Sequence, residues 1–229
     1  MRYLGEELEL FLKATNWKKY WSSFIENSNS SHALEIGAGI GGNYDYLVNK
    51  SARLTLVEPD SFFCENYLMN FSSKDSRVEV ICGTLQSTGA ETNFDAIYYI
   101  DVLEHIYDDI SELSLAVSHL KTNGSIYVIV PAFNFLFSEF DRSVGHFRRY
   151  TKKSIKKILP PNCQIDELKY LDSLGWFGSV ANKVLFSDKH ATPFKVKFWD
   201  NHLIPISKVL DKYMNYSIGK SLYVHIKKI

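Results

Sequence analysis

The 229-residue sequence has few cysteines, and their spacing forms no metal or disulfide pattern. Cys64, Cys82 and Cys163 are far apart and form no CxxC pair, so neither a zinc site nor a disulfide framework is expected. No other cluster has the spacing of metal ligands, and we expect metal-independent chemistry. So few cysteines suit a reduced compartment, and a cytoplasmic location is the expectation.

Long apolar runs are also missing. The longest, SIYVIVPAFNFLF, is interrupted by Pro131 and Asn134 and falls short of the roughly 20 residues that cross a bilayer. The opening residues, MRYLGEELELFLKATNW, carry acids where a secretion signal needs a basic start and a continuous apolar core. We therefore expect no transmembrane segment and no secretion, although peripheral contact with a membrane stays open.

Net charge is absent too, since 26 Lys and Arg balance 26 Asp and Glu, but the two signs are unevenly distributed. Residues 1–141 contain 9 Lys and Arg against 20 Asp and Glu, whereas residues 142–229 contain 17 against 6. A basic half can attract an anionic substrate, a membrane surface or nucleic acid. It can equally consist of solvated helices beside an acidic core, and both interpretations stay open.

What the sequence does contain is an alternation of short apolar runs and helical patterns. Five runs end in glycine or polar residues and indicate strands covered on both faces: HALEIGAG, RLTLVEPD, RVEVICGT, FDAIYYID and GSIYVIVPA. Helical segments such as SFFCENYLMNF and DDISELSLAVSHL separate them, and CQIDELKYLD and SLYVHIKK add two later strands. This pattern predicts an α/β fold with a doubly wound, mainly parallel seven-stranded sheet, whose ligands bind beyond the carboxyl ends of the strands.

We expect a single domain over residues 1–229. Its expected parts are N-terminal helices in 1–30, a cofactor-binding core in 31–131, a substrate loop and basic helix in 132–160, and a helical lid insertion in 172–220. The favoured interpretation of one apolar helix face in the insertion is packing on the core: Ile206, Val209, Leu210, Tyr213 and Met214.

The segment LEIGAGIGGN fits two glycine patterns. Gly37, Gly39 and Gly42 fit the GxGxxG fingerprint of nicotinamide-dependent oxidoreductases, whereas Gly37, Gly39 and Gly41 fit ExGxGxG, which begins at Glu35. A carboxylate here is poorly placed beside a pyrophosphate but well placed beside an ammonium or sulfonium group. S-adenosylmethionine carries both cations, so Glu35 favours this cofactor over NAD.

The next strand ends in Glu58, whose two carboxylate oxygens can accept hydrogen bonds from both hydroxyls of a ribose. Both candidate cofactors contain a ribose. Glu58 therefore supports a nucleoside without separating the two.

With LEIGAGIG, LVEPD, FDAIYYIDVLEHI and LKTNGSIYVIVPA, residues 30–131 resemble the class I S-adenosylmethionine-dependent methyltransferases, which have a Rossmann-like fold. The resemblance implies S-adenosylmethionine as cofactor and S-adenosylhomocysteine as product. The contacts it implies are Gly37, Ala38, Gly39 and Gly41 with the methionine part, Glu58 with the ribose, Pro59 and Asp60 near the adenosine, and Asp101 and Val102 beside the methyl donor. CGTLQS stands where many members have an adenine-binding acid, so Thr84 and Leu85 are expected to contact the adenine.

Two histidines are candidates for a general base, because imidazole titrates near neutrality with a pKa of about 6.5. His146 lies in DRSVGHFRRY, after the fifth strand, and can pair with Asp141. His105 lies in DVLEHI, after the fourth strand, where it can also serve only to order its loop. His146 with Asp141 is the first candidate and His105 the second.

Arg148 and Arg149 carry planar guanidinium groups suited to carboxylate or phosphate, and with Tyr150 they are predicted to bind the substrate. The alternative is a loop held by an Asp–Arg ion pair with Tyr150 packed beneath it. The segment PAFNFLFSEFDRSVGHFRRYT resembles a bacterial subgroup of these methyltransferases associated with surface polysaccharide and glycolipid assembly. This resemblance implies O-methylation, by direct displacement, of a sugar, glycan or related small anionic molecule, free or lipid-linked.

Three other functions stay open. The first is an NAD-dependent oxidoreductase, from the GxGxxG pattern. The second is a nucleic-acid methyltransferase, which the basic half permits, but the fourth-strand motif lacks the Asn/Asp-Pro-Pro-aromatic pattern of base-amine methyltransferases. The third is a binding module that docks on a membrane or partner through its insertion.

Overall fold

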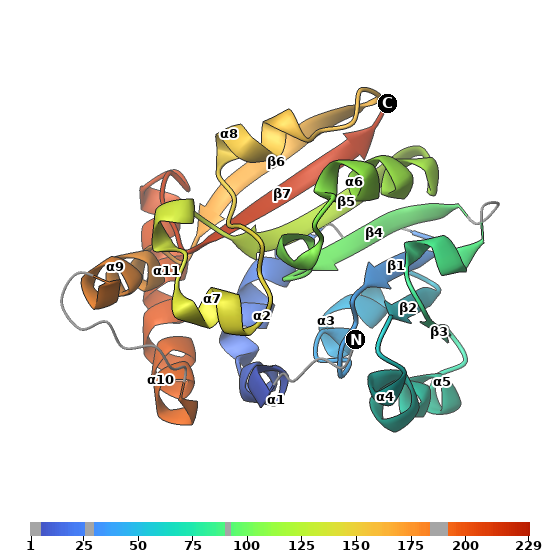
Figure 1. The fold of residues 1–229 in the computed structure, drawn as a ribbon, viewed down its shortest axis with the longest axis horizontal. Helices are drawn as coiled ribbons and strands as arrows, with labels where there is room; N and C mark the ends of the chain where they lie inside the picture. Colours follow the sequence, from blue (N-terminus) through green and yellow to red (C-terminus); the bar gives the residue numbers. More distant parts are fainter. Residues whose placement is uncertain (1–5, 26–29, 90–92, 184–191) are drawn as a thin grey trace.

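The computed structural model describes residues 6–25, 30–89, 93–183 and 192–229 (Figure 1). These residues form one seven-stranded sheet in the order β3-β2-β1-β4-β5-β7-β6. The strands are β1 (Ala33–Ile36), β2 (Leu54–Glu58), β3 (Val78–Cys82), β4 (Phe94–Ile100), β5 (Leu120–Pro131), β6 (Cys163–Leu171) and β7 (Ser221–Lys228). Only β7 runs antiparallel to its neighbours, β5 and β6. The predicted α/β sheet is confirmed, and it is mostly but not purely parallel.

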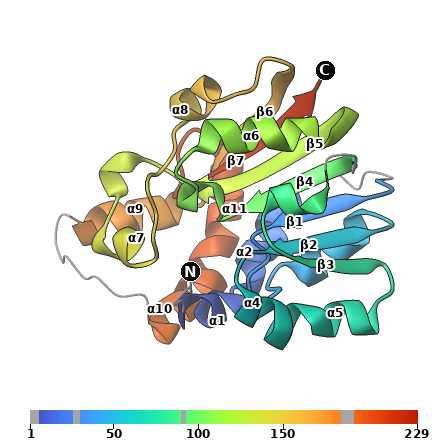
Figure 2. The same ribbon diagram turned by 45° about the vertical axis from the view of Figure 1, so that its right-hand side comes forward.

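Helices cover both faces of the sheet (Figure 2). Beneath the sheet lie α2 (Thr15–Ser22), α3 (Tyr44–Leu47), α10 (Pro193–Phe198) and α11 (Ile204–Tyr213), and above it lie α6 (Asp109–Ser118) and α8 (Lys152–Lys157). Consecutive strand residues therefore enter different cores, since Ala33 packs with α2 and Leu34 with α6. This explains why the central runs are apolar at every position.

Shorter elements connect these layers. They are α1 (Glu6–Leu12), η1 (Val48–Lys50), α4 (Ser61–Phe63), η2 (Cys64–Leu68), α5 (Met69–Lys74), η3 (Leu85–Thr88), η4 (Leu103–His105), η5 (Asn134–Leu136), α7 (Glu139–Ser143), α9 (Ser173–Ala181) and η7 (Trp199–Leu203). Several helices have an N-cap residue whose side chain accepts a backbone hydrogen bond: Asp60 in α4, Asp108 in α6, and Thr151 in the predicted basic helix α8. In the described part of the chain, every helix is too short or too polar to cross a bilayer.

The segment predicted as a helical insertion contains α9, α10, η7 and α11. The prediction that the apolar face of α11 packs on the core is wrong. Ile206, Val209 and Tyr213 are 52%, 55% and 85% exposed, whereas Ser207 and Asp211 are fully buried.

Hydrogen bonds explain this orientation of α11. The Asp211 carboxylate accepts from the hydroxyl of Tyr20 at 2.9 Å and from the backbone N–H groups of Asp172 at 2.7 Å and Ser173 at 2.9 Å. The Ser207 hydroxyl donates to Asp172 Oδ1 at 2.9 Å. Buried polar groups need partners, and these partners lie on the side of the helix that faces the sheet.

Replacing Asp211 with alanine tests this network. We expect Asp211→Ala to lower the free energy of unfolding by about 2–4 kcal/mol, because three buried donors lose their acceptor. Chemical denaturation measures the change, and Lys212→Ala on the exposed face of the same helix is the matched control. Equal stabilities of the two variants would contradict this account of the helix orientation.

Candidate functional site

A cavity of about 660 Å³ lies at the carboxyl ends of β1, β4 and β5. Three groups of residues line it. They are the glycine loop after β1 (Gly37, Ala38, Gly39, Ile40 and Gly42), the residues after β4 (Asp101, Glu104 and His105), and the residues after β5 (Asp141, His146 and Arg149). The motifs that the sequence placed at three separate strand ends thus meet at one cavity.

The glycine loop follows the second of its two possible patterns. Gly37, Gly39 and Gly41 have φ angles of +67°, +56° and +75°, whereas Gly42 lies outside the left-handed region. A Cβ added to Gly41 would lie 2.2 Å from Cε2 of Phe71. The backbone conformation therefore favours glycine at all three ExGxGxG positions but not at Gly42, and the space available is also too small for a Cβ at Gly37 and Gly41.

Glu58 joins the first two strand ends. Its Oε2 accepts from the backbone N–H of Gly39 at 2.8 Å and its Oε1 from that of Asp60 at 2.9 Å. Burial raises its pKa although these hydrogen bonds oppose the shift. Each carboxylate oxygen keeps a second lone pair, so the predicted contact with ribose hydroxyls remains available.

The residues predicted to lie near the adenosine are outside the cavity, at the neighbouring carboxyl ends of β2 and β3. Pro59 and Thr84 are exposed, Asp60 is half-buried, and Leu85 is buried at the start of η3. They occupy the same edge of the sheet as the glycine loop, since β3, β2 and β1 are adjacent and parallel. Their contacts with adenine stay a prediction.

Glu35 lies beneath the glycine loop and does not line the cavity. Its Oε1 accepts from Asn43 Nδ2 at 2.9 Å, whereas Oε2 has no hydrogen-bond partner within the described residues. Burial raises its pKa to about 7. Lys18, and not Glu35, lines the cavity, and its Nζ donates to the carbonyl oxygen of Gly42 at 2.6 Å.

Asp101 faces the cavity from the end of β4. Its φ of +55° is uncommon for a residue other than glycine, and its N–H donates to the carbonyl of Ile129 in β5 at 2.9 Å. The side chain is exposed to the cavity, but desolvation by the cavity walls raises the pKa of its carboxyl to about 6. The following residue, Val102, packs against Gly37, which brings the ends of β1 and β4 into contact.

Asp141 and His146 form the predicted acid–imidazole pair. Asp141 is fully buried, and its Oδ1 lies 2.9 Å from His146 Nδ1. Arg149 donates to both oxygens of the same carboxylate, with Nε and Nη2 at 2.9 and 2.8 Å. Ser138 donates to Oδ2 from its backbone N–H and its hydroxyl. Burial opposes ionisation, but the hydrogen bonds from His146 and Arg149 hold the pKa of Asp141 well below its usual range.

The other two residues predicted to bind substrate point away from the cavity. Arg148 forms an ion pair with Asp109 at 2.8 Å and donates to the carbonyls of Ile106 and Tyr107. Tyr150 is buried, and its hydroxyl donates to Asp109 Oδ2 at 2.7 Å. For these two side chains the geometry matches the alternative of a braced loop, and only Arg149 of the three lines the cavity.

Glu104 is a buried acid beside the histidine pair. Its side chain is fully buried, neither of its oxygens has a hydrogen-bond partner in the described part of the chain, and burial raises its pKa well above the usual range. Its Oε1 lies 3.8 Å from His146 Nε2. The spacing in DVLEHI placed this acid near the site, but only the fold shows that it faces His146.

His105 packs edge-on against His146, with ring centroids 4.5 Å apart. Burial and the neighbouring His146 lower its pKa to about 4, which makes it a weaker base than an ordinary histidine. Within the described residues, Glu104, His105 and His146 are the one group spaced to hold a metal ion, with ligand atoms within 4.8 Å of one another. The metal-independent chemistry expected from the sequence therefore stays a prediction.

Residues from distant segments complete the cavity, and the sequence did not indicate them. Lys18, Trp17 and Trp21 come from α2, Trp199 comes from η7, and Lys220 directly precedes β7. The Lys220 ammonium lies 5.3 Å from the centroid of the Trp199 ring, and burial lowers its pKa. Trp17 and Trp21 are closely spaced aromatic residues in the segment expected to form N-terminal helices, and this spacing is the one sequence signal that could have indicated the wall.

Comparisons with known proteins agree with this geometry. A family model described as a methyltransferase domain matches residues 34–126. A search of curated proteins found no match.

Solved structures share the fold at low sequence identity. An S-adenosylmethionine-dependent methyltransferase from Clostridium acetobutylicum has a TM-score of 0.64 at 14% identity and covers 97% of this chain and 98% of its own. The N-methyltransferase NodS from Bradyrhizobium japonicum, in complex with S-adenosylhomocysteine, has a TM-score of 0.57 at 13% identity and covers 94% and 85%. A complex of a Haloferax volcanii methyltransferase with its activator Trm112 contains a chain with a TM-score of 0.65 at 12% identity, covering 97% and 94%.

The residues around the cavity fit S-adenosylmethionine as a cofactor. Three glycines open the loop for close approach of a ligand, Glu58 presents a carboxylate beside it, and Asp101 offers an anion at the position expected for the charged methyl donor. The matched domain and this donor set agree with the ExGxGxG pattern and not with the NAD fingerprint. Residues 34–126 therefore match a methyltransferase domain, and the protein is a methyltransferase whose cofactor is S-adenosylmethionine.

Proposed function

We propose that this enzyme methylates a hydroxyl group of a small acceptor, with His146 as the general base. The observation that supports the proposal most strongly is the Asp141–His146 pair, held on the wall of the cavity. A hydroxyl is a weak nucleophile until a base takes its proton, and histidine is the usual base near neutral pH. The proposed acceptor class is a sugar, a glycan or a related small anionic molecule.

The tautomer of His146 follows from its partner. Asp141 is ionised and can only accept, so His146 donates from Nδ1–H and keeps its lone pair on Nε2. Arg149 and Ser138 occupy the rest of the carboxylate and hold it in place. This arrangement orients a basic nitrogen toward the space shared with Glu104.

The proton transfer can then be described in terms of these groups. His146 Nε2 accepts the proton of the acceptor hydroxyl as the oxygen bonds to the methyl carbon, and Asp141 stabilises the imidazolium that forms. When bound, S-adenosylmethionine supplies a methyl group on a sulfonium, which leaves as the neutral thioether. The gap of 3.8 Å between His146 Nε2 and Glu104 Oε1 is too long for a direct hydrogen bond, and a hydroxyl between them would contact both.

Positive and aromatic side chains support an anionic, ring-shaped acceptor. Lys18 and Lys220 line the cavity together with the rings of Trp17 and Trp199, whereas the charge of Arg149 is already paired with Asp141. Ammonium and guanidinium groups bind carboxylate or phosphate, and indole faces pack on the apolar faces of sugar rings. Burial of the reacting atoms between these walls favours a step in which opposite charges disappear.

Amine methylation is a second candidate, and Glu104 is the observation that favours it. A buried carboxyl whose two oxygens have no hydrogen-bond partner among the described residues can accept hydrogen bonds from an amine, a group that needs both an acceptor and a base. NodS, which shares the fold, is an N-methyltransferase. Methylation of nucleic acid, an acceptor disfavoured by the sequence motifs, would be recognised by strong salt dependence of substrate binding.

The first prediction of the proposed function concerns the cofactor loop. Gly41→Ala should weaken binding of S-adenosylhomocysteine roughly tenfold to a hundredfold, because alanine is strained at this φ and its Cβ meets Phe71. Gly42→Ala is the matched control, since its Cβ meets only the ends of the Lys18 and Leu12 side chains. Calorimetric titration measures both affinities, and a larger loss for Gly42→Ala would favour the NAD fingerprint instead.

The second prediction concerns pH. Because the pKa of Asp101 is raised to about 6, the affinity for the cationic S-adenosylmethionine should rise as the pH increases through about 6 and then level off. The ionised carboxylate attracts the cofactor's positive charges, whereas the neutral acid does not. Asp101→Asn should flatten this dependence, and the exposed Asp166→Asn should retain it. A flat profile in the wild-type protein would exclude this role for Asp101.

The third prediction tests the base. His146→Ala should reduce transfer of labelled methyl groups to the acceptors in an extract of the source organism by about 10²- to 10⁴-fold, with the affinity for S-adenosylhomocysteine unchanged. His105→Ala should cost less, because the low pKa of His105 makes it a poor base. Glu104→Gln separates the two acceptor classes, since it should impair an amine acceptor more than a hydroxyl acceptor. Undiminished transfer by His146→Ala would remove this residue from the mechanism.

A further inference from the structure

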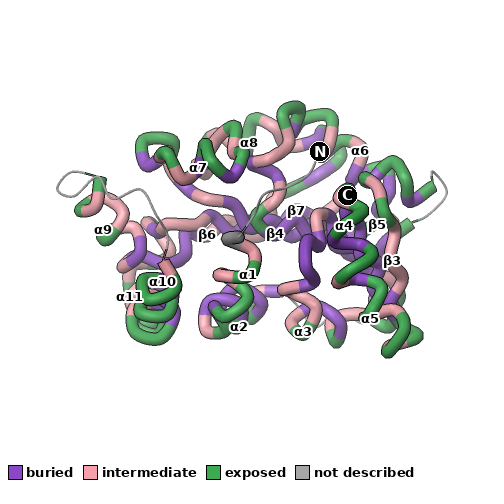
Figure 3. The backbone as a smooth tube through the Cα atoms, turned by 60° about the horizontal axis from the view of Figure 1, so that its bottom comes forward, coloured by how far each residue is buried: buried purple, intermediate pink, exposed green. Residues whose placement is uncertain are grey.

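The helical segment of residues 193–213 carries an apolar stripe on its solvent side. It consists of α10, η7 and α11 in direct succession. The large apolar residues of this stripe are 48% to 85% exposed: Phe194, Phe198, Ile206, Val209 and Tyr213. They recur about one helical turn apart, with the exposed His202 between Phe198 and Ile206, so they lie along one side of the helix. In Figure 3 the tube at α10 is coloured mostly as exposed.

The opposite side of the same helix contains its acids. Val196, Asp200, Ile204, Ser207 and Asp211 are buried. Asp200 accepts from the backbone N–H groups of Asn16 and Trp17 at 3.1 and 2.8 Å, as Asp211 accepts from α2 and α9. Every acidic side chain of residues 193–213 is therefore turned inward and bonded.

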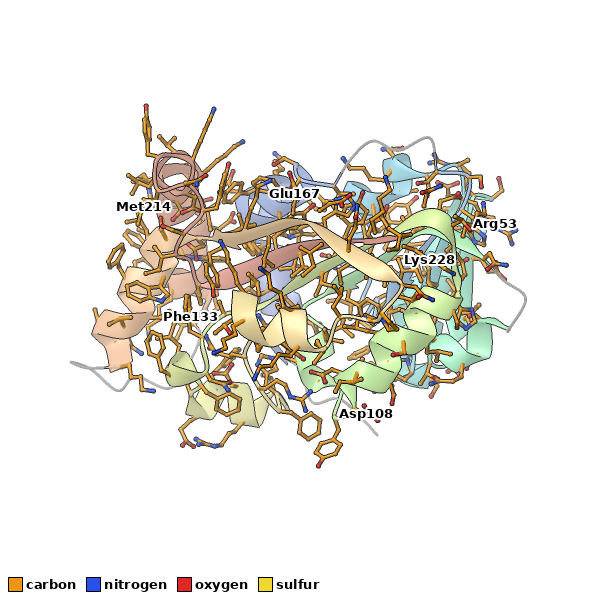
Figure 4. All side chains as sticks on the ribbon, turned by 90° about the horizontal axis from the view of Figure 1, so that it is seen from above. Arg53, Asp108, Phe133, Glu167, Met214 and Lys228 are labelled. Atoms are coloured by element: carbon orange, nitrogen blue, oxygen red, sulfur yellow. The ribbon has the colours of Figure 1, made fainter. Side chains whose placement is uncertain are left out.

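The exposed charges beside the stripe all have one sign. Lys195, Lys197, Lys208 and Lys212 are exposed, and the segment has no exposed acid. Figure 4 shows side chains that project from this helix near Met214, away from the sheet. An apolar stripe flanked by lysines is typical of helices that lie in the interface of a membrane with anionic lipids. We will call residues 194, 195, 197, 198, 206, 208, 209, 212 and 213 the lysine-flanked stripe.

We propose that the lysine-flanked stripe docks on the surface of an anionic lipid membrane. The apolar side chains would enter the boundary between headgroups and acyl chains, and the four lysines would contact lipid phosphates. A second copy of this chain fits the stripe less well, because a symmetric contact places the same lysines opposite one another. The charge pattern therefore favours lipid over self-association.

The position of the stripe connects it with the cavity. Trp199 belongs to the same helix and lines the cavity, and Lys220 packs on its ring. One helix thus forms a wall of the cavity on its inner side and the lysine-flanked stripe on its outer side. Docking would hold the enzyme beside acceptors that are attached to lipid, but the docking itself does not depend on the identity of the acceptor.

Sedimentation with vesicles tests the proposal directly. The full chain should sediment with vesicles of equal parts phosphatidylcholine and phosphatidylglycerol, weakly or not at all with phosphatidylcholine alone, and less as salt rises. A triple variant, Ile206→Ser with Val209→Ser and Tyr213→Ser, should bind at least about tenfold more weakly. The three replaced side chains are exposed in the wild-type protein, so the variant should still fold. Thermal unfolding checks that it does.

Charge-reversed variants test the proposal independently in the same vesicle assay and include a matched control. Lys208→Glu with Lys212→Glu should also weaken binding at least about tenfold. Lys156→Glu with Lys157→Glu makes the same change in α8, a basic helix without exposed large apolar residues, and should leave binding nearly intact. Failure of the wild-type protein to bind anionic vesicles, or equal loss in both charge-reversed variants, would overturn the proposal. Self-association that the triple variant abolishes, without vesicle binding by the wild type, would assign the stripe to a dimer instead.

Discussion

The buried carboxylate of Asp141 is the interaction on which the acceptor side of the site depends. It receives two hydrogen bonds from Arg149, one from His146 and two from Ser138, and it is fully buried. A buried charge is costly unless it is paired, so these partners cannot move independently of it. Because His146 and Arg149 both line the cavity, a single carboxylate sets the positions of the proposed base and of a neighbouring cation.

The same segment is anchored to the sheet at a second point. Tyr150 donates its backbone N–H to the carbonyl of Pro131, and Ala132 and Tyr150 form a parallel bridge beyond the end of β5. The chain between them forms a closed loop that holds Asp141 and His146 over the cavity. On the cofactor side, Glu58 ties the β1 and β2 loops together, since it accepts from the backbone N–H groups of Gly39, 19 residues earlier, and of Asp60. Both sides of the site therefore depend on hydrogen bonds within a loop and on hydrogen bonds between segments further apart in the chain.

The sequence separation of each contact explains how much could be predicted from the sequence. The strands, the glycine loop and the Asp141–His146 pair follow from local patterns, because each involves residues that are neighbours in the chain. The partners of Arg148 and Tyr150 could not be predicted in this way, since both side chains reach Asp109, about 40 residues earlier. The two arginines are adjacent and chemically alike, yet one faces the cavity and the other the start of α6.

The prediction of which face of α11 packs on the core was wrong for a similar reason. Its apolar periodicity predicted core packing, but the hydrogen bonds of Asp200 and Asp211 to α2 and α9 turn the opposite face inward. An apolar pattern describes a helix face without saying what covers it, and a buried acid with several donors outweighs a few exposed apolar side chains. The burial of Glu104 could not be predicted from a sequence pattern either. It depends on the loop after β5, which packs over Glu104.

The proton on His146 is the most direct measure of the central claim. Nitrogen NMR of the imidazole, in the protein bound to S-adenosylhomocysteine, distinguishes the two neutral tautomers. The Asp141 hydrogen bond predicts a proton on Nδ1 and an unprotonated Nε2 directed into the cavity. A proton found on Nε2 would contradict the account, because the nitrogen that faces the acceptor would then have no lone pair for its hydroxyl proton.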